Sequence, residues 1–171
     1  MADFHVLQQI DIFFEFGPEQ LGQVAALCEE KRFGVGDLVF EENSASDELY
    51  VIAAGEVDIL VDPSLVGDRA GGSPSRPTTI ATLRRGQCFG EVALVDQGLR
   101  SASARSGSHE THLLVIPRQA LMDLCERDPA LGYRLMRNLA ADLATKIRNT
   151  DLRIREELLY SQRGARAGNE S

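Results

Sequence analysis

The chain has 171 residues, a mass of 18.7 kDa and a formal net charge of −8, which fits one compact acidic domain. Its 43% hydrophobic and 26% charged residues are ordinary for a globular protein and exclude a wholly disordered chain. Three widely spaced cysteines exclude a disulfide framework. Because the sequence also lacks a signal peptide and a long apolar run, we expect a soluble cytoplasmic protein.

Charge is distributed unevenly along the chain. Residues 1–62 carry a net charge of −12, whereas residues 63–171 carry +4, and arginine supplies 16 of the 18 basic residues. The acidic balance argues against a nucleic-acid-binding protein. The basic excess of the second segment is either a solvated face or the surroundings of a bound anion, for which arginine is a good ligand.

The first predicted elements are helices. Residues 4–33 have the apolar spacing of amphipathic helices, and Gly17-Pro18 divides them into two. Proline is favoured in the first turn of a helix, so Pro18 is expected to begin the second one. We therefore predict N-terminal helices within residues 4–33.

From residue 34 the sequence changes to short β-type runs separated by Gly, Asn, Ser or Asp. Alternation of apolar and polar residues is clearest over residues 56–61. A series of such runs is typical of an antiparallel sandwich or roll, which we place at residues 34–117. The predicted strands cover residues 37–41, 49–53, 56–61, 79–83, 101–105 and 111–117.

Residues 63–77 interrupt this series with three glycines, three prolines and three serines. The composition predicts a long loop between two strands. Such a loop is either an insertion that a hairpin tip tolerates or a functional segment.

The last predicted elements are helices within residues 118–163. A short helix over residues 118–127 is ended by Asp128-Pro129, and a second runs from Ala130 to about Gln162. At 1.5 Å per residue this second helix would be about 50 Å long, longer than one small domain needs. The predicted domain thus covers residues 1–163, and residues 164–171 form a disordered tail.

A heptad pattern runs along the long helix. Its positions step by four and three residues, which is typical of a seam that packs against another helix. The first part of the seam fits a core-facing stripe, whereas the part after Ile147 is harder to cover within one chain. We therefore expect a homodimer formed through this helix. The seam consists of Met136, Ala140, Leu143, Ile147, Thr150 and Ile154.

Residues 86–104 contain the groups that a cyclic phosphate ester requires. Gly90 allows close approach of the backbone, and residues 91–95 can form a short helical turn whose first amide groups face an anion. Arg100 can bind two phosphate oxygens through its guanidinium fork. An ionised Glu91 can accept a hydrogen bond from a ribose hydroxyl. This segment alone predicts a site for a nucleoside monophosphate.

The same segment resembles the phosphate-binding cassette of the cyclic nucleotide-binding domain family. The family pattern is Phe-Gly-Glu-x-Ala-Leu, a variable loop, and Arg followed by small residues, and residues 89–94 and 100–104 fit it throughout. Residues 33–40 and 47–57 resemble the first three strands of the family, and the overall resemblance extends over residues 7–160. Family members include catabolite activator proteins and the regulatory subunits of cyclic AMP-dependent kinase.

The resemblance implies a mainly β fold, an antiparallel double-stranded β-helix (a jelly-roll-like β-roll) capped by N-terminal helices and a long C-terminal helix. It implies that Glu91 binds the ribose 2′-hydroxyl and that Arg100 binds the exocyclic phosphate oxygens. It further implies that the backbone amides of Gly90, Ala93 and Ser101 complete the phosphate site, and that Val92 and Leu83 lie beside the sugar and base. The expected ligand-binding residues are Gly90, Glu91, Val92, Ala93, Arg100, Ser101 and Ala102.

The identity of the base is weakly encoded. The family's base-contacting residues lie on its last helix without a fixed motif, so the candidates here are also plain surface or dimer positions. Ser101 after the arginine is compatible with cyclic AMP and does not exclude cyclic GMP. Asn43 stands where the family often has glycine, and asparagine tolerates the left-handed conformation. The candidates are Lys146, Arg148, Asn149 and Thr150.

These observations predict a non-enzymatic cyclic AMP sensor in signal transduction, whose C-terminal helices move on ligand binding and are read by a downstream effector. One alternative is a roll without ligand, in which Glu91 and Arg100 pair with each other and the chain serves for dimerisation or as a scaffold. Another is the sensor fragment of a transcription regulator. We expect no cofactor, nucleic-acid partner or membrane partner. We also expect no metal site, because His109 and His112 point to opposite faces of a strand.

Overall fold

The computed structural model describes residues 4–45, 47–62, 76–96 and 98–167. Two four-stranded antiparallel sheets form a β-roll, in the orders β1-β8-β3-β6 and β2-β7-β4-β5, which confirms the predicted fold class. The strands are β1 (Glu29–Phe33), β2 (Leu38–Phe40), β3 (Glu48–Ala54), β4 (Glu56–Val61), β5 (Thr78–Arg84), β6 (Cys88–Phe89), β7 (Ser103–Ser106) and β8 (Thr111–Pro117).

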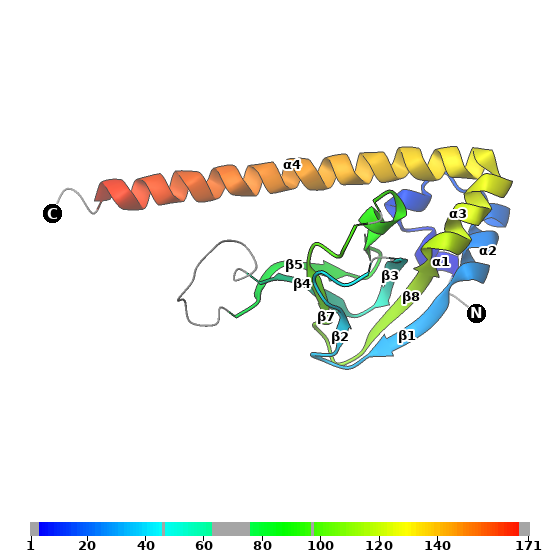
Figure 1. Ribbon diagram of the computed structural model, residues 1–171, viewed down its shortest axis with the longest axis horizontal. Helices are drawn as coiled ribbons and strands as arrows, with labels where there is room; N and C mark the ends of the chain where they lie inside the picture. Colours follow the sequence, from blue (N-terminus) through cyan, green and yellow to red (C-terminus); the bar gives the residue numbers. More distant parts are fainter. Residues whose placement is uncertain (1–3, 46, 63–75, 97, 168–171) are drawn as a thin grey trace.

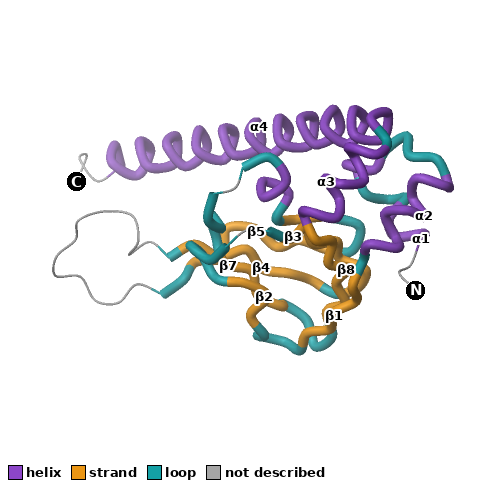
Figure 2. The backbone as a smooth tube through the Cα atoms, turned by 45° about the vertical axis from the view of Figure 1, so that its right-hand side comes forward, coloured by secondary structure: helices purple, strands orange, loops and turns teal. Residues whose placement is uncertain are grey.

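Helices gather at one end of the roll, and the longest of them extends over it (Figure 1; Figure 2). The helices are α1 (Phe4–Leu7), the 3-10 helix η1 (Asp11–Phe13), α2 (Pro18–Leu27), the 3-10 helix η3 (Glu91–Leu94), α3 (Arg118–Arg127) and α4 (Pro129–Ala167). Within the described ranges no helix is long and apolar enough to cross a membrane.

The sheet that contains β3 is buried on both faces by two different hydrophobic cores. Leu49 and Val51 of β3 pack toward the helices, whereas Tyr50 and Ile52 face the interior of the roll. Strand β8 alternates in the same way over residues 113–116. Because successive side chains of a strand point to opposite faces, a nearly continuous apolar run here serves both cores.

Two helix boundaries follow from local hydrogen bonding. Helix α2 begins at Pro18, and the Gln20 side chain accepts a hydrogen bond from the Gly17 amide at 3.2 Å. The Asp128 carboxylate accepts hydrogen bonds from the Ala130 and Leu131 amides, both at 3.1 Å, and so caps α4. These amide bonds lower the pKa of Asp128. The predicted break between the last two helices at Asp128-Pro129 is confirmed.

Three features of the fold differ from the prediction. Residues 29–33 are not helical but form β1, an edge strand that pairs with β8, so the roll begins at Glu29 and not at residue 34. Its Glu-Glu-Lys-Arg sequence lacks an apolar period because charged side chains are favoured on an edge strand. Strand β6 was also not predicted. Helix α4 continues to Ala167, so residues 164–167 are helical, and the rest of the predicted tail lies outside the described residues.

Strands β4 and β5 form a hairpin from Glu56↔Arg84 to Val61↔Thr78, so the predicted loop does connect two paired strands. Residues 63–75 of that loop lie outside the described residues. A register shift between Ile59 and Leu60 breaks the expected alternation of β4.

Candidate functional site

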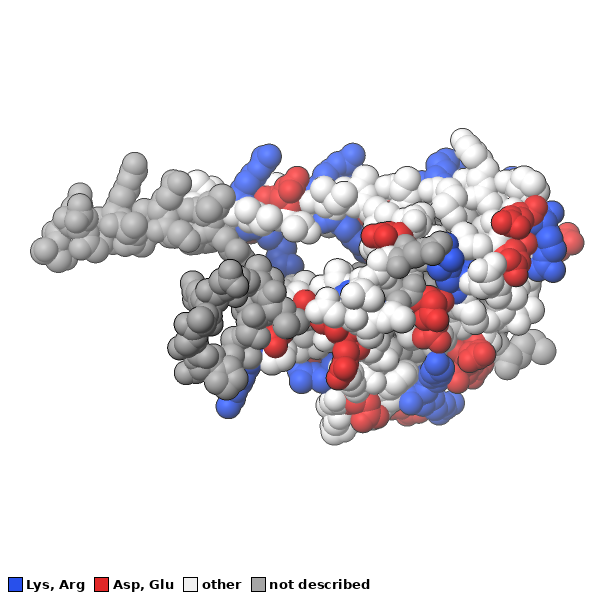
Figure 3. Space-filling model, in the orientation of Figure 1, with Lys and Arg blue, Asp and Glu red and all other residues white. Residues whose placement is uncertain are grey.

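A cavity of about 400 Å³ lies between the roll and α4. In Figure 3 a hollow opens there, with basic side chains on its α4 side. All seven predicted ligand-binding residues line it, as does Leu83. The seven residues are Gly90, which caps η3, and residues of η3 and of the segment between η3 and β7, whereas Leu83 belongs to β5. Residues of α4 line the same cavity from the opposite side. The residues that the sequence predicts as ligand-binding therefore line one cavity.

Arg100 is the most deeply buried cation of this cavity, with only 5% of its surface exposed. Its Nη2 donates a hydrogen bond to the Glu48 carbonyl at 3.0 Å. Its Nε and Nη1 are buried and have no hydrogen-bond partner among the described residues. An unpaired buried charge is costly, so these two nitrogens are available to an anion that enters the cavity.

Two hydrogen bonds to the turn at Asn43 and Ser44 fix the Arg100 backbone, and Gly90 leaves space for the Arg100 side chain. Asn43 adopts the left-handed conformation predicted for it, with φ of 64°, and its amide donates to the Arg100 carbonyl at 2.8 Å. The Arg100 amide donates to the Ser44 carbonyl at 2.9 Å. Gly90 has φ of +77°, and a Cβ atom there would lie 2.6 Å from Arg100 Nη1. Glycine is therefore required for both conformation and space.

Glu91 is the buried anion of the site, with 7% of its surface exposed. Lys146 of α4 donates a hydrogen bond to Glu91 Oε1 at 2.9 Å and also lies 2.9 Å from Asp142 Oδ2. Burial lowers the pKa of Lys146, but the Glu91 and Asp142 carboxylates outweigh it and raise the pKa above its ordinary value. Lys146 is therefore a charged link between α4 and η3.

Helix α4 contributes four residues to the cavity, each one turn or less from the next. Lys146, Asn149 and Thr150 were candidates from the sequence, whereas the fourth candidate, Arg148, does not line it. Arg153 was missed, although it follows Asn149 and Thr150 at the i+4 and i+3 spacing that places residues on one helix face. Its Nη1 donates to the Ile80 carbonyl of β5 at 2.7 Å.

The cavity has a polar and an apolar part. The polar part contains Arg100, Lys146, Glu91 and the amide groups of η3, although the Ala93 amide already donates to the Gly90 carbonyl at 3.1 Å. Strand side chains form the apolar part. This division suits a ligand with an anionic group at one end and a flat apolar ring system at the other. The apolar lining residues are Ile59, Ala81, Leu83 and Phe89, and Phe40 lies at the border with the polar part, its ring centroid 4.2 Å from the Arg100 Cζ atom.

Comparison with known proteins agrees with this geometry. The family model described as cyclic nucleotide-binding domain matches residues 30–128, more than half of the chain. The chain belongs to that family. The expected resemblance is thus confirmed.

Individual relatives are similar over most of this domain. The cyclic AMP receptor protein of Thermus thermophilus is 31% identical over 143 residues, which are 84% of this chain. A cyclic nucleotide-binding domain from Methylobacillus flagellatus has a TM-score of 0.73 at 25% identity, covering 88% of this chain and 79% of that one. The N-terminal domain of a transcriptional regulator from Streptomyces coelicolor has a TM-score of 0.69 at 25% identity, covering 82% and 94%. The chain spans 60% of the length of the Thermus receptor.

Proposed function

We propose that this protein binds a cyclic nucleotide, with cyclic AMP as the preferred ligand, and acts as a regulatory sensor in the cytoplasm. The supporting observation is Arg100, a buried cation whose Nε and Nη1 lack partners beside a cavity of about 400 Å³. The alternative of a ligand-free roll required Arg100 to pair with Glu91. In the described part of the chain Glu91 instead pairs with Lys146, and no carboxylate satisfies Arg100.

The ligand is expected to occupy the cavity from end to end. Its phosphate binds Arg100 together with the Gly90 and Ser101 amides, and its ribose 2′-hydroxyl donates to Glu91. Val92, Ala93 and Ala102 surround the sugar and phosphate, and the base lies against the apolar strands and α4. The name of the Thermus relative favours cyclic AMP, and cyclic GMP is the alternative ligand.

We infer that the signal is movement of α4. Lys146 and Arg153 join this helix to η3 and β5 at the edge of the cavity, so a ligand that alters these contacts changes the position of the helix. A ligand shifts such an equilibrium only by its difference in affinity for two helix positions. An effector protein then reads the new position.

We also infer a homodimer through the C-terminal part of α4. Ile147 and Ile154 are 63% and 50% exposed and lie seven residues apart, on one face of the helix. Lys146, Asn149 and Arg153 face the cavity from a neighbouring side of the helix, and the seam residue Thr150 lines the cavity where the two sides meet. The proposed dimer face is therefore next to the ligand face and shares Thr150 with it.

Isothermal titration of the purified chain with cyclic AMP, cyclic GMP and 5′-AMP tests the ligand. We expect micromolar or tighter binding of cyclic AMP and no comparable binding of 5′-AMP. Arg100→Ala is expected to weaken binding about 100-fold or more, because two charge-assisted hydrogen bonds are lost. Arg105→Ala, the same change at an exposed position of β7, is the matched control. A folded sample that gives no heat with either cyclic nucleotide contradicts the proposal.

A further inference from the structure

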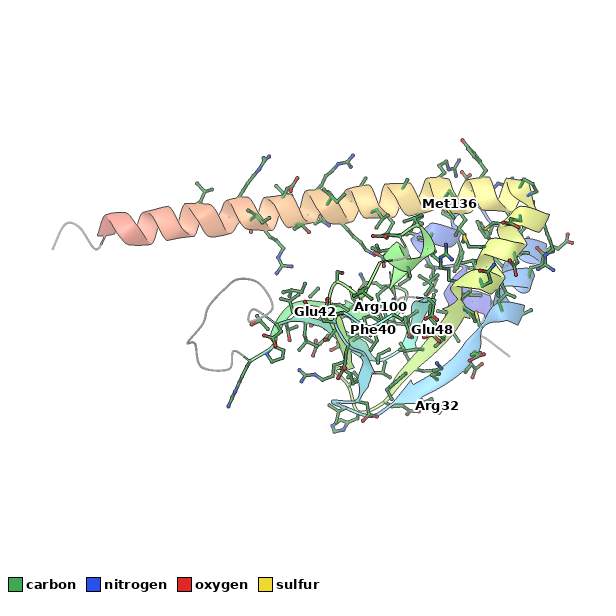
Figure 4. All side chains as sticks on the ribbon, viewed as in Figure 1. Arg32, Phe40, Glu42, Glu48, Arg100 and Met136 are labelled. Atoms are coloured by element: carbon green, nitrogen blue, oxygen red, sulfur yellow. The ribbon has the colours of Figure 1, made fainter. Side chains whose placement is uncertain are left out.

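The guanidinium group of Arg100 is held in an unusual way for a buried cation. Its Cζ atom lies 4.2 Å from the centroid of the Phe40 ring and 5.4 Å from that of the Tyr50 ring. Its one described side-chain hydrogen bond goes to a neutral carbonyl, that of Glu48. Figure 4 shows Phe40, Glu48 and Arg100 grouped inside the roll below α4. Aromatic faces therefore occupy the place that a carboxylate usually takes beside a buried arginine.

These rings form a rigid platform. Phe89 stacks on Tyr50 with centroids 5.0 Å apart, and Phe40 lies 5.5 Å from Tyr50 and 5.9 Å from Phe89. The Tyr50 hydroxyl donates to the Glu48 carboxylate, which also binds Lys31. Burial and this carboxylate raise the pKa of Tyr50, so its hydroxyl stays protonated. The platform is fixed from the far side and presents ring faces to Arg100.

Packing against aromatic rings leaves the positive charge of Arg100 unneutralised, which packing against a carboxylate would not do. A carboxylate would hold the guanidinium but would also neutralise it and occupy two of its nitrogens. A ring face attracts the cation through its quadrupole, takes up no N–H group and carries no net charge. The Nε and Nη1 of Arg100 accordingly lack partners among the described residues although the side chain is fixed.

We propose that Phe40 is a positioning residue for Arg100: its ring holds the guanidinium in place through a cation–π contact and leaves the charge free for the ligand phosphate. This inference rests on the proposed function, in which that phosphate is bound by Arg100. Phe40 acts at the phosphate end of the site, so its contribution is the same for cyclic AMP and cyclic GMP.

Phe40→Leu tests this role, because leucine keeps an apolar side chain in the roll core but lacks a ring face. We expect affinity for cyclic AMP and for cyclic GMP to fall by the same factor, about tenfold, as loss of one partly desolvated cation–π contact implies. Phe40→Tyr, which keeps the ring, is expected to restore binding. Phe33→Leu is the matched control, because Phe33 packs against the same core but does not line the cavity.

A double-mutant cycle separates positioning from simple packing. In an Arg100→Gln background, which keeps a polar side chain but has no cation, the Phe40→Leu change is expected to cost less than threefold, since the charge that the ring holds is absent. An equal loss in both backgrounds, or equal losses from Phe40→Leu and Phe33→Leu, would overturn the proposal.

A measurement without nucleotide keeps this inference distinct from the proposed function. The Arg100 Nε–H resonance of the free protein is expected to be shifted by the ring current of Phe40, and to move in Phe40→Leu but not in Phe33→Leu. If native protein binds no cyclic nucleotide while this shift is present, the ring contact stands and the proposed function fails. If nucleotide binds while Phe40→Leu leaves both the resonance and the affinity unchanged, the positioning role fails.

Discussion

The two halves of α4 are held in place by different kinds of contact. In the first half, residues 129–143, Leu131, Leu135 and Leu139 are buried in the core, and the Asn138 side-chain amide donates to two carbonyls beside η1. In the second half, residues 144–167, the side-chain hydrogen bonds that the structure describes to the rest of the fold are those of Lys146 and Arg153. The first half is fixed by the fold, whereas the second is fixed at the ligand site.

This difference limits where a ligand can act. The first half is held by apolar burial, and its buried leucines, Leu131, Leu135 and Leu139, do not line the cavity. The second half depends on two polar contacts at the cavity, each of modest free energy because water competes for the same groups. Under the proposed function, we therefore expect a ligand to bias the position of the second half of α4 while the first half stays docked.

The largest expected effect is on the free energy of unfolding, and it comes from a change in the first half of α4. Asn138→Ala removes the donor from the Ile12 and Phe14 carbonyls, which it reaches at 3.2 and 2.7 Å, and should lower the free energy of unfolding by about 2 kcal/mol. Cyclic AMP affinity of the folded protein should stay within twofold. Urea denaturation and titration measure the two quantities. Asn149→Ala, the same change at an exposed position of the second half, should leave stability unchanged, and an equal loss there would contradict the comparison.

The next largest expected effect is on cyclic AMP affinity, and it comes from a change in the second half of α4. Lys146→Met removes the cation that links α4 to Glu91, and we expect cyclic AMP affinity to fall about tenfold, near 1.4 kcal/mol. Lys146→Arg keeps the charge and is the control. The pKa of Lys146 is raised above its ordinary 10.5 in the folded protein. The contribution of this ion pair to the free energy of unfolding is therefore fully present below pH 10.5 and is lost only as the pH rises through the higher folded value. A contribution that disappears between pH 7 and 9 would contradict the ion pair.

Much of the fold and of the candidate site could be predicted from the sequence, because local sequence patterns encode them. The cassette of residues 89–94 and 100–104 combines a glycine conformation, a short helical turn and an arginine at fixed spacing, and the cavity contains them together. The α3–α4 break follows from Asp128-Pro129. Most strands were predicted because their apolar runs are bounded by turn residues.

What the sequence did not predict depends on partners distant in the chain. Strand β1 is polar and exists because β8 pairs with its backbone, which no local pattern reveals. The link between Lys146 and Glu91 spans 55 residues and depends on where α4 crosses the roll. The heptad seam was only partly a core stripe: Met136 and Leu143 pack against the core, whereas Ala140 is exposed.

The smallest effect on fold and ligand should come from the outer face of the second half, where the dimer is proposed. Ile154→Glu places a charge on the seam and should convert a dimer to a monomer in sedimentation velocity, with cyclic AMP affinity within twofold. Leu152→Glu is the control, because Leu152 is 57% exposed but lies on a different face of the helix. If both variants dissociate alike, the seam is not the interface. If neither does, the exposed apolar residues of α4 have another role, and the contacts at Lys146 and Arg153 then act within a single chain.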